Sequence, residues 1–99
     1  MSLKKTQERL FAKCAEIMAA KNHDYAGDGD ELANFRMCGQ FGIPIEQGIF
    51  VRLLDKVARI GNFLKQGELK VTDEKLEDTI CDLINYAVIL KEAIGEKNA

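Results

Sequence analysis

The spacing of apolar residues along the chain predicts helices and no strands. Apolar positions recur every three or four residues, which places them on one face of an α-helix. In the first such segment, residues 3–21, they are Leu10, Phe11, Cys14, Ile17 and Met18. The following segment NHDYAGDGD, residues 22–30, contains two glycines and four Asn or Asp residues and predicts a loop.

Two further helices are expected in the middle of the chain. Residues 31–42 predict a short helix, with Asp30 as its N-cap and Gly42 just past its end. Residues 43–67 predict a long helix. Pro44 suits its first turn, where a missing N–H has no partner to lose, and Gly67 suits its C-terminal end.

The last helix begins after Thr72, a plausible N-cap, and is expected to run to about Ile94, with Gly95 after it. The whole chain, residues 1–99, is then one all-α domain: a small helical bundle of three long helices and one short one.

Composition narrows the class of protein. The chain is 46% hydrophobic and 30% charged, with a formal net charge of −2. A nonspecific duplex nucleic-acid binder would usually be basic. No segment approaches the roughly 20 apolar residues of a membrane span, so no membrane partner is expected. The three cysteines match no metal-binding spacing and are read as free thiols of a cytoplasmic protein.

The fourth helix carries polar residues in an otherwise apolar surface. At 100° per residue, Asp78, Asp82 and Asn85 share one stripe with Ile89. One interpretation is that this stripe faces solvent. The other is that Asp78 and Asp82, which as like charges at i,i+4 repel by a few tenths of a kcal/mol, share a divalent cation. Mg²⁺ prefers carboxylate oxygens and would suit them, and Mn²⁺ is the alternative.

The third helix has a charged face opposite its apolar one. This face contains Arg52, Asp55 and Arg59, with Lys56 at its edge. Ion pairs at i,i+3 and i,i+4 on a solvated face explain it without any function. The functional interpretation is that Asp55 joins the metal site while Arg52, Lys56 and Arg59 bind phosphate, for which Arg offers a planar fork and Lys a point charge.

Several stretches of the chain resemble the nucleotide modification associated domain 1 family of phages and bacteria. They are KNHDY from residue 21, the run VRLLDKVARI over residues 51–60 and the run VTDEKLEDTICDLINYAVIL over residues 71–90. That family is in turn similar to the MazG-like all-α nucleotide pyrophosphohydrolases. Those enzymes hold Mg²⁺ with acids on two adjacent helices, whereas the first of these helices offers only Asp55 here.

The resemblance implies a MazG-like bundle that acts as a Mg²⁺-dependent (deoxy)nucleoside triphosphate pyrophosphohydrolase. Asp55, Asp78 and Asp82 would be catalytic and would hold the metal together with Glu74. Arg52, Lys56 and Arg59 would bind phosphate, and Lys21, Tyr25 and Asn85 would contact the rest of the nucleotide. Two alternatives stay open: a noncatalytic module that binds a modified nucleotide, and a structural helical adaptor.

Self-association is also expected. The fourth helix is apolar over more than half its circumference, and the apolar face of the third helix is broadened by Phe50, Val51, Val57, Phe63 and Leu64. A monomer of this size covers only part of such a surface. The sequence therefore predicts a homodimer or homotetramer, with the fourth helix near a twofold axis and Ile89 buried in the interface.

Overall fold

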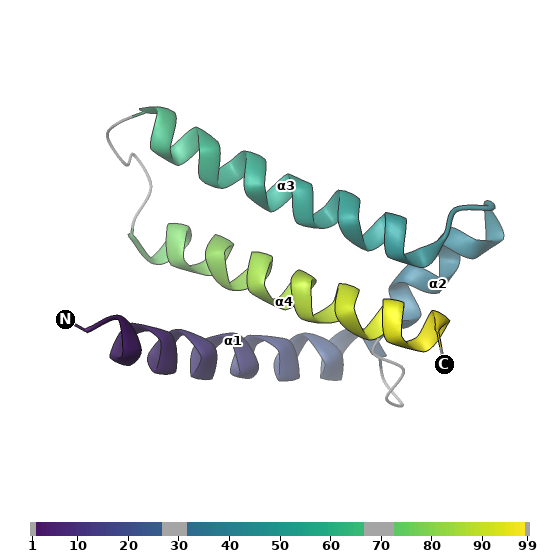
Figure 1. Ribbon diagram of the computed structural model, residues 1–99, viewed down its shortest axis with the longest axis horizontal. Coiled ribbons are helices and arrows are strands. Elements are labelled where there is room, and N and C mark those ends of the chain that lie inside the picture. Colours follow the sequence, from purple (N-terminus) through teal and green to yellow (C-terminus); the bar gives the residue numbers. More distant parts are fainter. Residues whose placement is uncertain (1, 27–31, 67–72, 99) are drawn as a thin grey trace.

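The structure is a computed structural model that describes residues 2–26, 32–66 and 73–98. Within these ranges it contains four helices and no strand: α1 (Leu3–Ala26), α2 (Ala33–Gln40), α3 (Ile45–Gln66) and α4 (Asp73–Lys97) (Figure 1). The prediction of an all-α bundle with three long helices and one short one is confirmed.

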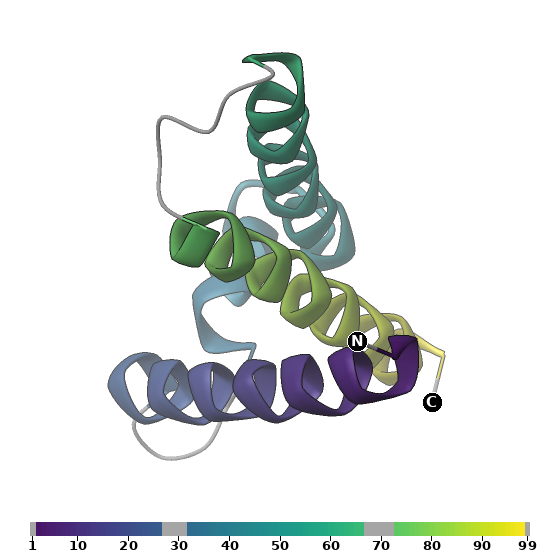
Figure 2. The same cartoon turned by 90° about the vertical axis from the view of Figure 1, so that its left-hand side faces the viewer.

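α4 is the central helix of the molecule. It lies between α3 and α1, and α2 closes one end of the arrangement (Figures 1 and 2). The most extensive contact is between α3 and α4, and α1 packs on α4 and α2, whereas α1 and α3 do not pack against each other in the described ranges. The three long helices therefore form a layer with two open sides.

The buried core is small and lies near the end closed by α2. Its centre is the cluster of Leu32, Ile49 and Ala93, of which Ile49 is 0% exposed. Phe35, Ile45, Tyr86, Ile89 and Leu90 pack against it. Ile89 is partly buried by this core of its own chain, and its further burial by a partner chain stays a prediction.

α1 is longer than its sequence predicts. It continues through residues 22–26, which were expected to belong to a loop. Extending an existing helix adds one backbone hydrogen bond per residue, whereas Asn and Asp cost only a few tenths of a kcal/mol relative to good helix formers. Turn-forming composition alone therefore does not end this helix.

α4 also continues beyond its expected end at Ile94. It passes through Gly95 to Lys97. Two ion pairs hold its last turn: Glu96 bonds Arg36 of α2 at 2.8 Å, and Lys97 bonds Glu46 of α3 at 2.8 Å. Contacts with two neighbouring helices thus favour the helical form of a turn that glycine would otherwise weaken.

The ends of α2 and α3 test the predicted caps. Leu32 is the N-cap of α2 and makes no side-chain capping bond, so Asp30, which lies outside the described residues, is not the residue at that position. Gly42 follows α2 with φ = +75°, the left-handed conformation expected of it. Pro44 directly precedes α3, and its carbonyl accepts the N–H of Gln47 at 3.0 Å. Thr72 and Gly67 lie outside the described residues.

Candidate functional site

Asp82 lies where the three long helices meet. Its side chain is 19% exposed, and each carboxylate oxygen has its own cationic partner. Lys21 of α1 bonds Oδ1 at 3.0 Å, and Lys56 of α3 approaches Oδ2 at 3.3 Å. Lys56 is only 13% exposed. The polar stripe of α4 therefore does not face open solvent at Asp82 but joins α4 to α1 and α3.

Tyr86 lies one turn further along α4 than Asp82 and contacts residues of α3 and α2. Arg52 of α3 lies 5.9 Å from the centre of the Tyr86 ring and donates a long, 3.4 Å hydrogen bond to the Tyr86 hydroxyl. Phe35 of α2 meets Tyr86 edge to face, with ring centres 6.3 Å apart. The bond to Tyr86, followed by attraction to Asp55 and Asp82, raises the pKa of Arg52.

We call Lys21, Arg52, Lys56, Asp82 and Tyr86 the charged cluster. Lys21 and Lys56 pair with the Asp82 carboxylate, and Arg52 is attracted to both Asp55 and Asp82. With Asp55 included, three positive and two negative side chains give a formal charge of +1 at neutral pH. Asp55 and Arg59 continue the row begun by Arg52 along α3, at steps of three and four residues. Two residues of the charged face of α3 contact α4: Lys56 at Asp82 and Arg52 at Tyr86. The predicted role of Asp55 in a shared metal site stays a prediction.

A second group of ion pairs joins α1 to α4 nearer the beginning of both helices. Glu77 bonds Arg9 at 2.6 Å and Lys13 at 2.9 Å, and Lys13 also bonds Asp78 at 2.9 Å. Hydrogen bonds from Lys13 and then Arg9 lower the pKa of Glu77. The bonds to Asp78 and Glu77 in turn raise the pKa of Lys13.

These pairs bear on whether Asp78 and Asp82 suit a metal ion. The repulsion between the two carboxylates is offset by lysines, Lys13 at Asp78 and Lys21 with Lys56 at Asp82. Among the described residues, no three His, Cys, Asp or Glu side chains gather closely enough to hold a metal. As arranged here the aspartates do not fit Mg²⁺, which would have to displace the ammonium groups from Asp82.

The other predicted site residues have different surroundings. Asn85 donates a 3.0 Å hydrogen bond from Nδ2 to the Cys14 carbonyl, so its amide helps to hold α1 on α4. Arg59 is exposed on α3. The side chains of Tyr25 and Glu74 lie outside the described residues, and their predicted roles stay predictions.

Sequence reasoning missed the basic partners that α1 supplies to α4. Lys13 received no role, and Lys21 was assigned to the nucleotide and not to Asp82. A signal for the first pairing was present, because Arg9 and Lys13 are one turn apart on one face of α1 and the acids Glu77 and Asp78 are adjacent on α4. Local sequence patterns do not indicate that two helices so distant in the chain, α1 and α4, will pack against each other.

No helix in the described ranges is long and apolar enough to cross a membrane. Comparison of the chain with protein-family models, with curated proteins and with solved structures gives no match. The resemblance to the nucleotide modification associated domain 1 family and to MazG-like enzymes therefore stays a prediction from the residues.

Proposed function

We propose that this protein binds a nucleotide through its phosphate groups at the charged cluster. One observation carries the proposal: Lys21 of α1 and Lys56 of α3 converge on a single carboxylate, Asp82, and Arg52 of α3 lies beside them against Tyr86. A cluster with more cationic than anionic side chains attracts an anion of two or more charges, and the arginine can bind phosphate oxygens with two parallel N–H bonds.

Asp82 has a definite part in this proposal. By bonding Lys21 and Lys56 it holds both flexible side chains in place before a ligand arrives, which lowers the entropy cost of binding. A phosphate group can then share or replace Asp82 as their counterion. Arg59, further along the same face of α3, extends the row of positive charge toward a second phosphate.

This proposal corresponds to the noncatalytic alternative, a nucleotide-binding module. The second candidate is a metal-dependent nucleoside triphosphate pyrophosphohydrolase. It is favoured by the attraction of Arg52 to both Asp55 and Asp82, since this means that carboxylates of α3 and α4 lie on the same side of the helix pair. Asp82 is paired with two lysines, and this pairing does not suit a metal. Nucleotide binding at the charged cluster requires no metal.

The first experiment is calorimetric titration of a panel of (deoxy)nucleoside mono- and triphosphates in EDTA. We expect binding by the wild type and at least tenfold weaker binding by Lys56→Met, since a hydrogen bond to a charged group contributes about 1.5–3 kcal/mol. Lys65→Met is the matched control, because Lys65 is on α3 but about 180° round the helix from Lys56. Equal losses in both variants would argue against the charged cluster.

The second experiment separates the two candidates by measuring pyrophosphate release with Mg²⁺ or Mn²⁺. Binding without turnover supports the module, and metal-dependent release supports the pyrophosphohydrolase. Asp82→Asn sharpens the distinction. It removes an anion that competes for Lys21 and Lys56, so the module should keep or improve its affinity, whereas an enzyme that uses Asp82 as a ligand should lose activity. No nucleotide binding with or without metal would contradict both.

A cytoplasmic location belongs to the same proposal. The three cysteines are free, and Cys14 and Cys81 are buried. Burial, together with a hydrogen bond to Cys14, raises the pKa of the Cys81 thiol to about 12, so it stays protonated and unreactive. Inert buried thiols are typical of proteins in a reducing compartment.

A further inference from the structure

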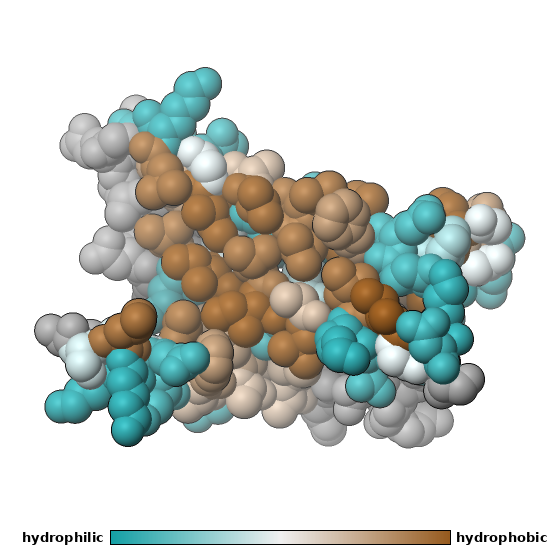
Figure 3. All heavy atoms as spheres, in the orientation of Figure 1, coloured by the Kyte–Doolittle hydropathy of each residue, from teal (hydrophilic) through white to brown (hydrophobic). Residues whose placement is uncertain are grey.

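A broad apolar surface covers the side of the molecule that faces the viewer in Figure 3. It extends over α3 and α4 and reaches α1. We call this surface the apolar face. The residues that define it are Phe11, Phe50, Leu54, Val57, Leu64 and Val88.

The apolar face and the charged cluster are on opposite sides of the α3–α4 pair. At 100° per residue, Phe50, Leu54, Val57 and Leu64 fall within an arc of about 80° on α3, roughly opposite the row of Arg52, Asp55 and Arg59. On α4, Val88 is about 120° round the helix from Asp82. A ligand bound at the charged cluster would therefore leave the apolar face uncovered.

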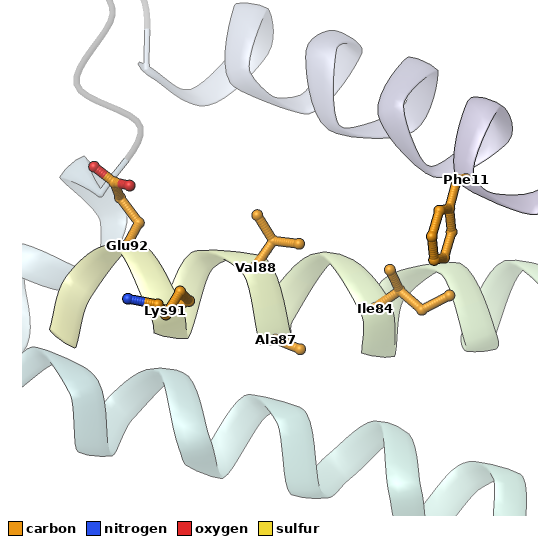
Figure 4. A pocket seen from close by; sticks show the side chains of 6 residues that line it. All are labelled: Phe11, Ile84, Ala87, Val88, Lys91 and Glu92. Atoms are coloured by element: carbon orange, nitrogen blue, oxygen red, sulfur yellow. The ribbon is translucent and has the colours of Figure 1, made fainter. Parts of the chain in front are cut away.

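The apolar face is hollowed where α1 meets α4. Phe11 projects from α1 toward Ile84 at one end of this hollow, and Val88 lies in its middle (Figure 4). Lys91 and Glu92, the two charged residues that line it, lie toward its other end. An apolar hollow between two helices suits a bulky apolar side chain of a partner.

The amount of exposed surface exceeds what a compact monomer of this size has. The chain exposes 7247 Å², whereas about 5,700 Å² is typical of a folded monomer of 11.1 kDa. Its radius of gyration is 15.1 Å, against about 13 Å expected for 99 residues. The excess area is well above the roughly 800 Å² that each partner buries in a standard interface.

We propose that a second copy of this chain covers the apolar face and forms a twofold homodimer. The face is self-complementary, because apolar stripes of α3 and α4 can pack on the same stripes of a partner. Lys91 and Glu92 carry opposite charges and are adjacent, so a twofold axis near them brings each beside its opposite in the other copy. This proposal is independent of the nucleotide site, since it uses the other side of the helices.

Sedimentation equilibrium of the full chain at micromolar concentration tests this proposal. We expect a particle of twice 11.1 kDa for the wild type. Val57→Glu should weaken association at least 100-fold, because a charge would be buried against apolar side chains. Val51→Glu is the matched control, since Val51 is 57% exposed and Val57 is 47% exposed. The sequence groups Val51 with the apolar residues of α3, but it lies about 120° round the helix from Val57 and about 60° beyond the edge of the apolar face.

Leu64→Glu, at a residue that is 72% exposed, is a second disrupting variant, and circular dichroism checks that each variant is folded. A wild-type monomer would overturn the proposal, as would a Val51→Glu variant that dissociates as much as Val57→Glu. A wild-type monomer that cosediments with phosphatidylcholine vesicles would assign the face to a membrane surface instead. Although Val57 follows Lys56 in the chain, it lies about 100° round α3 from it. Folded Val57→Glu should therefore still bind nucleotide if the proposed function is correct.

Discussion

The two sides of the α3–α4 pair differ in how their side chains are satisfied. On the charged side, Asp82 has partners from α1 and α3, and Arg52 packs on Tyr86, all within one chain. On the apolar side, Phe50, Leu54 and other large apolar residues are about half exposed, and none of the four described helices covers them. Charges are thus paired within the monomer, whereas the apolar surface is the one that the proposed dimer would cover.

This contrast separates two kinds of interaction on the same two helices. A small anion can exchange with Asp82 at a surplus of positive charge, which suits binding a ligand. An apolar face gains free energy in proportion to the area removed from water, about 25 cal/mol per Å², which suits a partner as large as the chain itself. Four predictions test whether the two sides are independent in this way.

The largest effect is expected from Ile49→Ala. Ile49 is 0% exposed at the centre of the core that positions α3 against α4. Removing its side chain should lower the free energy of unfolding by about 2–5 kcal/mol, measured by urea denaturation. Nucleotide binding and dimerisation should both be lost, because both need α3 to be held against α4. Loss of dimerisation with intact nucleotide binding would show that the two sides do not depend on a common core.

A smaller effect is expected from Lys56→Met on stability. This change leaves one oxygen of the part-buried Asp82 without its cation, and it should lower the free energy of unfolding by about 1–2 kcal/mol. Lys65→Met should change it by less than about 0.5 kcal/mol. Urea denaturation at one protein concentration compares them. Equal stabilities would mean that the charged side does not hold the helices together.

Salt should act differently on the two sides. Raising NaCl from about 0.1 M to about 1 M shortens the Debye length from roughly 10 Å to 3 Å. Nucleotide binding, measured by titration calorimetry, should weaken about tenfold. The dissociation constant of the dimer, measured by sedimentation, should change by less than about threefold, because apolar burial is not screened. A dimer that dissociates in salt would contradict the apolar interface.

The smallest effect concerns pH and Glu77. Its pKa is lowered from 4.5 by Lys13 and Arg9, so the carboxylate stabilises the fold above its ordinary pKa. That stabilisation should disappear as pH falls through the lowered value. Melting temperatures of the wild type and Glu77→Gln should differ near pH 7 and converge progressively once the pH falls below 4.5. A constant difference over this range would contradict the assignment.

The predicted helices agree best with the structure where they depend on local chemistry. Apolar periodicity located the three long helices, whereas α2 was predicted from Asp30 and Gly42, of which Asp30 is not its N-cap. Pro44 and Gly42 took the positions that a restricted φ and a positive φ suit. α1 and α4 are both longer than predicted. In α1, propagation of the helix outweighs the turn-forming Asn and Asp residues. In α4, the ion pairs of Glu96 and Lys97 outweigh the effect of Gly95.

The helical class, the amphipathic faces of α3 and α4 and the acids in an apolar stripe can all be predicted from the sequence, because they depend on residues within one or two turns. The groups that meet those acids depend on how the helices pack. The partners of Asp82 are 61 and 26 residues away in the chain, and a carboxylate stripe alone suits a metal or an ammonium equally well. The packing of α4 between α1 and α3 brings Lys21 and Lys56 to Asp82, and it also leaves the opposite apolar side uncovered.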